Sequence, residues 1–171
     1  MRDKMNITEK ILSVLLILVS VSYIYAQKSA GLKLKEVKVY FHFIGSEGIE
    51  SKVIPLKRRV SRKAPLFPTI EAMLAEPTEA EQKLGYYSAG YGDMKLVSVK
   101  LKRGVARIDF SRPIRDDYNP GDLQTLAFES AVIKTAKQFP GVKKVIVCVN
   151  GINEFGIGLV EDAPRPCPKE K

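Results

Sequence analysis

The chain has 171 residues, of which 45% are hydrophobic and 27% are charged, a composition typical of a globular protein with one domain and appended segments. Its formal net charge of +9 favours anionic partners, although a merely well-solvated surface would carry the same charge. Two cysteines are too few for a disulfide framework, and a single histidine excludes a paired-histidine metal site.

An apolar run near the N-terminus, Ile11 to Ala26, follows several basic residues and is the candidate signal segment within residues 1–30. At about 1.5 Å per residue the run would be about 24 Å long as a helix. This is short for a hydrocarbon core of about 30 Å, so a cleaved signal peptide and an uncleaved transmembrane helix both remain open. Bulky residues beside the candidate cleavage site, Tyr23 and Tyr25, favour the uncleaved anchor.

Either interpretation predicts an extracytoplasmic domain. An uncleaved run would make the chain a single-pass protein of the cell membrane, whereas cleavage would release it as a secreted or periplasmic protein. The Lys-rich residues Gln27 to Glu36 would form a tether. An extracytoplasmic location argues against nucleic acid as a partner and directs the basic charge towards wall polymer or anionic lipid.

Two strands are predicted after the tether. From Val37 to Ile44 apolar residues alternate with polar ones, which is typical of a strand with one buried face. A second strand extends from about Lys52 to Val60, and Pro55 favours a place at the edge of the sheet because proline lacks a ladder N–H. A basic cluster closes this strand, and its members are the candidate partner-binding residues Lys57, Arg58, Arg59, Arg62 and Lys63.

A short helix is predicted next, from about Pro65 to Ala75, with an apolar stripe along one side. Thr78 and Glu81 have the spacing of a capping box, which predicts a further helical turn. The Gly- and Tyr-rich loop Gly85 to Asp93 is either a connection held by its own tyrosines or a loop that stacks on a ligand.

A β-hairpin is predicted from the strands Lys95–Lys102 and Val105–Phe110, joined across Arg103-Gly104. Its first strand is expected to place Val97, Val99 and Leu101 on one face. Asp109 alternates with the apolar residues of the second strand, so we expect its carboxylate to be exposed.

The stretch from Asp122 to Gly151 is expected to organise the rest of the fold. Asp122 is a good helix N-cap, and Pro140-Gly141 ends the helix. The apolar face of this helix is expected to comprise Leu123, Leu126, Ala127, Phe128, Ala131, Val132, Ile133, Thr135 and Phe139. The strand that follows, from Val142 to Val149, is apolar on both faces, which predicts a central strand. We expect Phe139, Val145 and Val147 in the core.

The order strand, strand, helix, hairpin, helix, strand predicts an α+β fold, in which two main helices pack on one face of a mixed or antiparallel β-sheet of about five strands. The domain is expected to span residues 35–155, and the Pro-rich residues 156–171 are expected to form a flexible tail. Cys148 is most simply a small buried hydrophobe. A disulfide with Cys167 is chemically allowed outside the cytoplasm, but a flexible tail disfavours it.

The sequence predicts no catalytic residue, cofactor or metal. His42, the single histidine, falls on the polar face of a strand and is expected to be structural or solvated. Polar residues cluster before the long helix at Asp116, Asp117, Asn119 and Asp122. Their spacing matches no EF-hand loop, so solvation and capping explain them better than calcium does. We therefore do not expect an enzyme.

Four pieces of the chain, in order, resemble the GerMN domain, a module of bacterial sporulation and spore germination proteins. They are Val37–Phe43, Leu66–Thr78, Leu96–Phe110, and Phe139–Val145 with Val149–Gly151. Glu76 stands where the family usually has glycine, and Ala89 to Asp93 replace its usual Pro-containing loop. The resemblance extends over about two thirds of the chain.

The resemblance implies a small α+β domain similar to the ring-building motifs of secretion-type assemblies. It implies an extracytoplasmic, non-enzymatic protein, and it supplies no catalytic residue to carry over. We expect an assembly or interaction module of the cell envelope, bound to an envelope protein or to a second copy of itself. The alternative is a module that binds wall polymer or another anionic ligand, whose affinity would fall steeply with salt.

Overall fold

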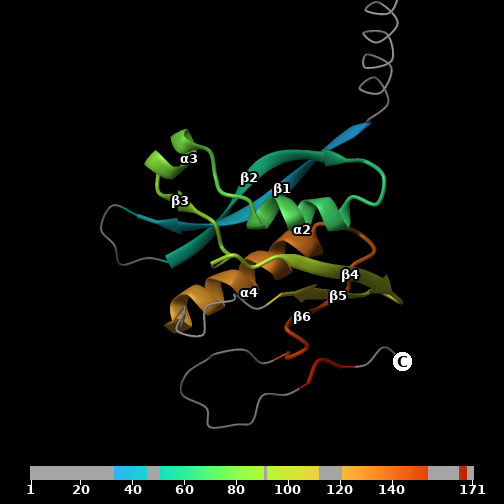
Figure 1. Ribbon diagram of the computed structural model, residues 1–171. Coiled ribbons are helices and arrows are strands. Elements are labelled where there is room, and N and C mark those ends of the chain that lie inside the picture. The colour runs from blue at the N-terminus through green and yellow to red at the C-terminus, as the bar shows by residue number, and fades with distance from the viewer. Residues whose placement is uncertain (1–32, 46–50, 91, 112–120, 154–165, 169–171) are drawn as a thin grey trace, which may run out of the picture. The chain divides into compact units, whose positions relative to one another are not determined.

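The computed structural model describes residues 33–45, 51–90, 92–111, 121–153 and 166–168 (Figure 1). The chain divides into two units, Met1–Lys33 and Leu34–Lys171, and the elements below all belong to the second. The apolar run Ile11–Ala26 lies outside the described residues, as do Asp116, Asp117 and Asn119. Within the described part of the chain, no helix has the length and apolar character needed to span a bilayer.

The first sheet has the strand order β2-β1-β3 and is antiparallel throughout. β1 (Leu34–Ile44) and β2 (Ser51–Ser61) pair along their whole length, whereas β3 (Tyr86–Tyr87) pairs only with His42 and Phe43 of β1. Alternation along β1 buries Val37, Val39 and Phe41 on one face, as the sequence predicts. β2 lies at the edge of this sheet, which confirms the placement of Pro55.

The second sheet has the order β4-β5-β6. β4 (Leu96–Lys102) and β5 (Val105–Phe110) form the predicted hairpin, and its turn residues Arg103 and Gly104 both have positive φ, as a tight hairpin turn requires. β5 pairs in parallel with β6 (Lys144–Val149). A parallel pair needs a long crossover, and α4 (Gly121–Lys137) lies within it.

Helices α2 (Leu66–Leu74) and α4 lie between the two sheets, and α3 (Glu79–Lys83) opens with the predicted capping box (Figure 1). The α+β class is therefore confirmed, but the strands divide over two sheets instead of forming one. The physical reason is that α4 buries a broad face: Phe128 packs against Phe110 of the second sheet at 5.0 Å between ring centroids, while Thr135 reaches the first sheet.

Two details of α4 differ from the prediction. Its exposed side includes Leu123, at 70% exposure, and Leu126, because the buried face is centred on Phe128, Val132 and Thr135. The small residues Ala127, Ala131 and Ala136 complete that face and allow the sheets to approach closely. The helix also begins at Gly121, one residue before the predicted N-cap Asp122.

β6 and β4 also correct the sequence analysis. β6 is an edge strand and not a central one, and Cys148 on its outer face is joined to Cys167 of a C-terminal segment. In β4 the register shifts between Leu96 and Ser98, and the bulge places Val97 at 63% exposure, off the face that Val99 occupies. The expected core residues Phe139 and Val147 are buried, and Val145 is partly buried against the core.

We predict that Phe128→Ala lowers the free energy of unfolding by about 3–5 kcal/mol, because it removes a fully buried ring between the sheets. Leu126→Ala, on the exposed side of the same helix, is the matched control and should change it by less than about 0.5 kcal/mol. Urea denaturation of both variants measures the difference. Equal destabilisation by the two substitutions would contradict this orientation of α4.

Candidate functional site

The structure separates the five predicted partner-binding residues. Arg58 lies on the inner face of β2, opposite Val37, where its guanidinium stands 4.9 Å from the centroid of the Phe41 ring. Lys57 and Arg59 are exposed on the outer face of the same strand, and Arg62 and Lys63 are exposed in the bend that follows it. This division follows from strand alternation, since successive side chains point to opposite faces.

Arg58 is committed to a structural ion pair. Its two terminal nitrogens donate to the two carboxylate oxygens of Glu81 at 2.8 and 2.7 Å, and Glu81 also accepts from the backbone N–H of Thr78 in the capping box of α3. The Arg58 hydrogen bonds, with smaller help from Thr78, lower the pKa of Glu81 although burial alone would raise it. Arg58 therefore ties α3 to the first sheet, and the other four residues are exposed cations.

On the outer face of the first sheet, Lys57 lies directly opposite Lys38. Two like charges at such a cross-strand position repel each other. Glu36 offsets part of this repulsion through an ion pair with Lys57 at 3.0 Å, but both side chains are exposed, so the pair contributes little. The outer face at this end of the sheet thus retains a positive potential.

The free edge of β2 is protected against adding another strand. The backbone N–H of Tyr40 donates to Thr135 of α4, so this N–H points away from β2. Tyr40 and Pro55 are therefore a non-hydrogen-bonded pair, and the backbone nitrogen of Pro55 faces the free edge. Proline offers no N–H there, and Nη1 of Arg58 donates to the backbone carbonyl of Lys57 at 3.0 Å. Together with the charges of Lys57 and Arg59, these features block open-ended strand addition.

Several chain segments bring exposed cations to the same end of the domain, the end where the chain enters it at Leu34. Gln138, just beyond α4, is hydrogen-bonded through its side chain to both backbone groups of Lys38, and Lys35 stands 5.3 Å from the Phe139 ring centroid. The backbone N–H groups of Lys143 and Lys144 donate to Gly104 in the β4-β5 turn. We call this end the basic pole; its exposed cations are Lys35, Lys38, Lys57, Arg59, Arg62, Lys63, Lys102, Arg103, Lys137, Lys143 and Lys144.

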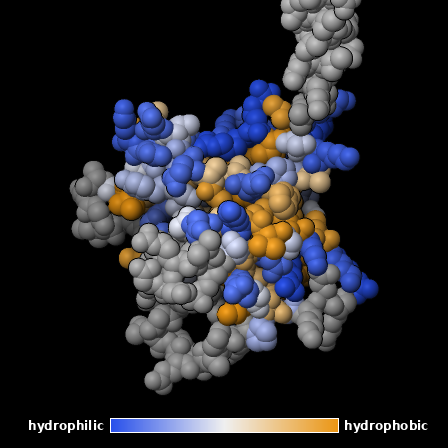
Figure 2. Space-filling view, viewed as in Figure 1, coloured by the Kyte–Doolittle hydropathy of each residue, from blue (hydrophilic) through white to orange (hydrophobic). Residues whose placement is uncertain are grey.

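Figure 2 shows hydrophilic residues along the side of the domain where β1 begins and where the β4-β5 hairpin turns, with apolar residues between them. Among the described residues that these contacts bring to the pole, Glu36 is the only acid. Other exposed acids, such as Glu76 and Glu79, lie around α3.

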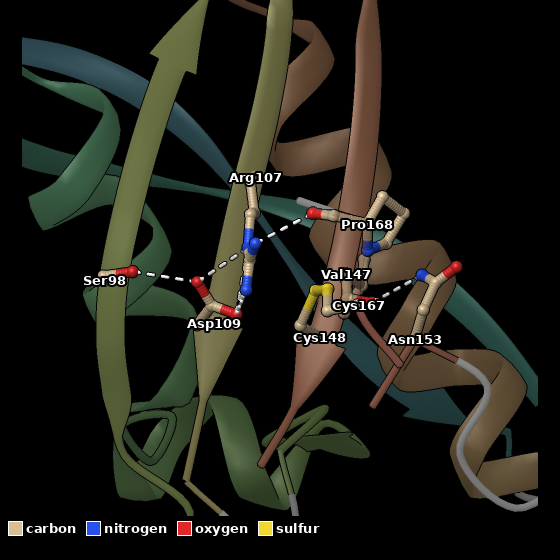
Figure 3. A network of polar contacts seen from close by, with 8 residues as sticks. All are labelled: Ser98, Arg107, Asp109, Val147, Cys148, Asn153, Cys167 and Pro168. Carbon is tan, nitrogen blue, oxygen red and sulfur yellow. Dashed lines mark hydrogen bonds and ion pairs between the residues drawn. A yellow bond between two sulfur atoms is a disulfide. The ribbon is translucent and has the colours of Figure 1, made fainter. Parts of the chain in front are cut away.

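A second polar cluster lies on the outer face of the second sheet (Figure 3). Nε and Nη2 of Arg107 each donate to one carboxylate oxygen of Asp109 at 3.2 Å. The hydroxyl of Ser98 donates to the same carboxylate at 3.0 Å. Arg107 also donates to the backbone carbonyl of Pro168 at 2.9 Å. Asp109 was expected to be exposed, but this network and the C-terminal segment cover most of its side chain.

The same segment is fastened by a disulfide between Cys148 and Cys167, whose Cα atoms are 6.0 Å apart. The backbone N–H of Cys167 also donates to Gly151, and Pro166 forms a bridge with Ile152. The expectation that Cys148 is unpaired is therefore wrong, because residues 166–168 pack against β6 instead of belonging to a free tail. A domain boundary at residue 155 would omit these contacts.

Asp109, Cys148 and Cys167 are close enough to suggest a metal site, since one ligand atom from each lies within 4.8 Å of the others. Both sulfur atoms are committed to the disulfide, however, and an oxidised pair offers no thiolate to a metal. Asp109 is also paired with Arg107. We therefore interpret this cluster as a structural clasp.

The remaining candidates, His42 and the Gly- and Tyr-rich loop, pack against neighbouring elements of the fold. His42 lies on the outer face of β1, and partial burial lowers the pKa of its imidazole. In the Gly- and Tyr-rich loop, the Tyr86 ring packs against Phe43 with centroids 5.2 Å apart and Ala89 is fully buried, which supports a connection held by its own side chains.

Sequence reasoning located the cations of β2 but missed two groups. The turn cations Lys102, Arg103, Lys143 and Lys144 are distant in sequence from β2, and only the packing of the β4-β5 turn against residues 143–144 brings them to the same end. Arg107 and Asp109 were recognisable in principle, because an Arg-x-Asp spacing in a strand places both side chains on one face.

Comparison with known proteins agrees with the fold. The model of a protein family, Germane, described as sporulation and spore germination, matches residues 38–154, well over half of the chain. The structure of tandem GerMN domains of the sporulation protein GerM from Bacillus subtilis superimposes with a TM-score of 0.52 and 21% identity. That match covers 79% of this chain but 45% of the tandem structure, so this chain spans less than half of it.

The first GerMN domain of the same Bacillus subtilis protein matches with a TM-score of 0.48 and 20% identity, over 77% of this chain and 94% of that domain. No match was found among proteins with curated functions. At these identities the structural similarity concerns the fold, and the family assignment rests on the family model.

We predict that Glu81→Gln destabilises the domain at neutral pH by about 1–3 kcal/mol, because it removes the charge that Arg58 binds. The folded state lowers the pKa of Glu81, so this stabilisation is present above the pKa of the unfolded chain and is lost as pH falls through the folded pKa. Urea denaturation across pH should show wild type and variant converging in acid. Glu76→Gln, at an exposed position, is the matched control and should change the free energy of unfolding at neutral pH by less than about 0.5 kcal/mol.

We also predict that replacing both cysteines, Cys148→Ala with Cys167→Ala, lowers the free energy of unfolding by about 3 kcal/mol, the value expected for a disulfide that closes a loop of this size. Dithiothreitol should destabilise the wild-type protein by a similar amount and leave the double variant unchanged. If dithiothreitol has no effect on the melting temperature of the wild type, the clasp does not stabilise the domain.

Proposed function

Because the chain belongs to the GerMN family of sporulation and spore germination proteins, we propose that it is a non-catalytic assembly module of the bacterial cell envelope, tethered to the membrane by its N-terminal run. The observation that carries this proposal is the basic pole, a large exposed surface on a domain whose other polar clusters are internally paired. Charged surfaces of this kind steer association and select partners.

The interior of the domain supports the same proposal. Arg58 is saturated by Glu81, Arg107 by Asp109, and the two cysteines by each other. General acid-base or nucleophilic catalysis needs a titratable group that is free to react in a cleft. The Arg58–Glu81 pair and the disulfide join separate segments, and the Arg107–Asp109 pair lies within β5. We therefore look for the function on the surface of the domain.

The partner under this proposal is another envelope protein or a second copy of the chain. The Bacillus subtilis structure holds two GerMN domains in tandem, and the match covers 45% of that chain. The tandem arrangement there supports association between domains of separate chains here. The tether Gln27–Glu36 would raise the effective concentration of the domain for other membrane-bound proteins.

A module that binds an anionic wall polymer is the second candidate, and the exposed cations Lys57, Arg59, Arg62 and Lys63 favour it. Salt separates the two. Polymer binding through counterion release weakens steeply as salt rises, whereas a protein interface that also buries exposed apolar side chains, such as Phe67 and Leu101, weakens less steeply.

We predict that chemical crosslinking in cells traps a specific envelope protein or a dimer of this chain. The variant Arg59→Glu/Arg62→Glu should reduce the crosslinked yield several-fold without lowering the melting temperature, since both side chains are exposed. The matched control is Lys83→Glu/Lys95→Glu, which makes the same charge change away from the basic pole. Equal yields from all three proteins would reduce these cations to a solvated face and would refute their role in assembly.

A further inference from the structure

We propose that the basic pole docks directly on the anionic headgroups of a phospholipid bilayer, so that the domain lies against the membrane in one fixed orientation. This inference rests on the proposed tethering for the proximity of the membrane. It names anionic lipid as a ligand of the basic pole, the same surface on which the proposed function rests. The surface comprises the basic pole and the exposed apolar side chains within it.

Backbone contacts hold the pole as one surface although its cations come from both sheets. Gln138 accepts from the N–H of Lys38 at 2.9 Å and donates to its carbonyl at 2.6 Å, which fixes the end of α4 to β1. Lys143 donates to Gly104 at 2.7 Å, which fixes the next turn of the chain to the β4-β5 hairpin. These contacts join the segment after α4 to β1 and to the β4-β5 hairpin, so the cations of both sheets belong to one surface.

The cations are distributed over a broad area instead of lining one strip. One group, Lys38, Lys57 and Arg59, lies on the first sheet towards the start of β1 and the end of β2. The other group, Lys102 and Arg103, lies at the turn of the β4-β5 hairpin in the second sheet. A linear acidic peptide or a single polymer strand would contact one group at a time. A plane of headgroups would contact both, which favours a bilayer as the partner.

Apolar side chains are interspersed among these cations. Leu34, Phe67 and Leu101 are 46%, 39% and 48% exposed. Leu34 begins β1, Phe67 lies in the first turn of α2 directly after the bend at Arg62-Lys63, and Leu101 precedes Lys102 at the hairpin end. Exposed leucine and phenylalanine surrounded by lysine and arginine are typical of surfaces that sit in the headgroup region, where apolar groups enter the interface and cations bind phosphate.

The path of the chain supports the same orientation. The described part of the domain begins at the pole, with β1 at Leu34, so the segment that leads back to Ile11–Ala26 is attached there. A short tether keeps its attachment point near the membrane. The pole is thus the part of the domain that the tether brings closest to the headgroups, and each cation within reach of an anionic surface adds attraction.

A tryptophan reporter tests the proposal on the full-length chain, because the natural sequence contains no tryptophan. Phe67→Trp places the reporter at the pole. Tyr87→Trp is the matched control, at an exposed position in β3, beside His42 towards the other end of β1. Each protein is reconstituted into vesicles of phosphatidylcholine alone or of phosphatidylcholine with phosphatidylglycerol, with and without brominated acyl chains as quenchers.

Docking predicts strong quenching of Phe67→Trp in the anionic vesicles, weak quenching in the zwitterionic ones, and weak quenching of Tyr87→Trp in both. Leu101→Trp, a second reporter at the pole, should behave like Phe67→Trp and guards against a folding defect in one variant. If the pole reporters are quenched no more than Tyr87→Trp in anionic vesicles, the proposal is wrong.

A charge-reversal pair supplies the second arm. In the Phe67→Trp background, Lys102→Glu/Arg103→Glu should reduce the ratio of docked to undocked protein by at least about twenty-five-fold, at about fivefold per cation removed. Lys83→Glu/Lys95→Glu is the control and should leave the ratio unchanged. If both pairs lower it equally, non-specific charge attraction explains the docking and the pole has no special role.

Two further observations separate this proposal from the others. Flotation with zwitterionic vesicles tests the tether alone, since docking does not operate there, so loss of the tether and loss of docking give different results. Soluble polyglutamate is then added as an acidic polypeptide. If it binds the pole while anionic vesicles leave the Phe67→Trp emission unchanged, the surface recognises an acidic protein and the lipid assignment is overturned.

Discussion

Burial of the broad face of α4 between two sheets is the constraint on which the rest of this domain depends. Phe128, Val132 and Thr135 of this helix are fully buried, and the helix packs against β1 and β2 of one sheet and β6 of the other. Because α4 connects β5 to β6, its position also forces those two strands to run parallel. Each sheet has three strands and buries its inner face against α2 and α4, so each relies on the helices for its core.

The end of α4 carries this constraint to the surface. Gln138 completes the hydrogen bonds of the β1 backbone at Lys38, and the turn after Phe139 completes those of the β4-β5 hairpin. The same contacts that satisfy exposed backbone groups gather the lysines of both sheets at one end. Strand alternation then decides which cations are exposed: Lys57 and Arg59 point outwards, while Arg58 points inwards to Glu81.

The sequence predicted local structure well because local patterns determine it. The alternation in β1, the Thr78–Glu81 capping box and the hairpin across Arg103-Gly104 were all recognisable from neighbouring residues. It could not divide the strands between two sheets, because that depends on which sides of α2 and α4 are covered. Leu123 and Leu126 have the same hydropathy as Leu66 and Leu74, which pack against the core. The bulge that exposes Val97 is likewise invisible in an apolar alternation.

The surface was less predictable than the fold. The basic cluster near β2 was found, but its extension to Lys102, Arg103, Lys143 and Lys144 depends on contacts between residues distant in sequence. The disulfide was disfavoured because the Pro-rich C-terminus resembles a free tail, whereas Arg107 and Gly151 supply partners for residues 167 and 168.

The central claim is that α4 joins both sheets into one cooperative unit, and native-state hydrogen exchange tests it most directly. The amide of Val39 in β1 reports on the first sheet, and that of Ile108 in β5 reports on the second. If the claim holds, both amides exchange with the same free energy and the same dependence on urea, equal to those of global unfolding. Exchange from one sheet at a clearly lower free energy, with a smaller urea dependence, would show that the sheets unfold independently and would contradict the claim.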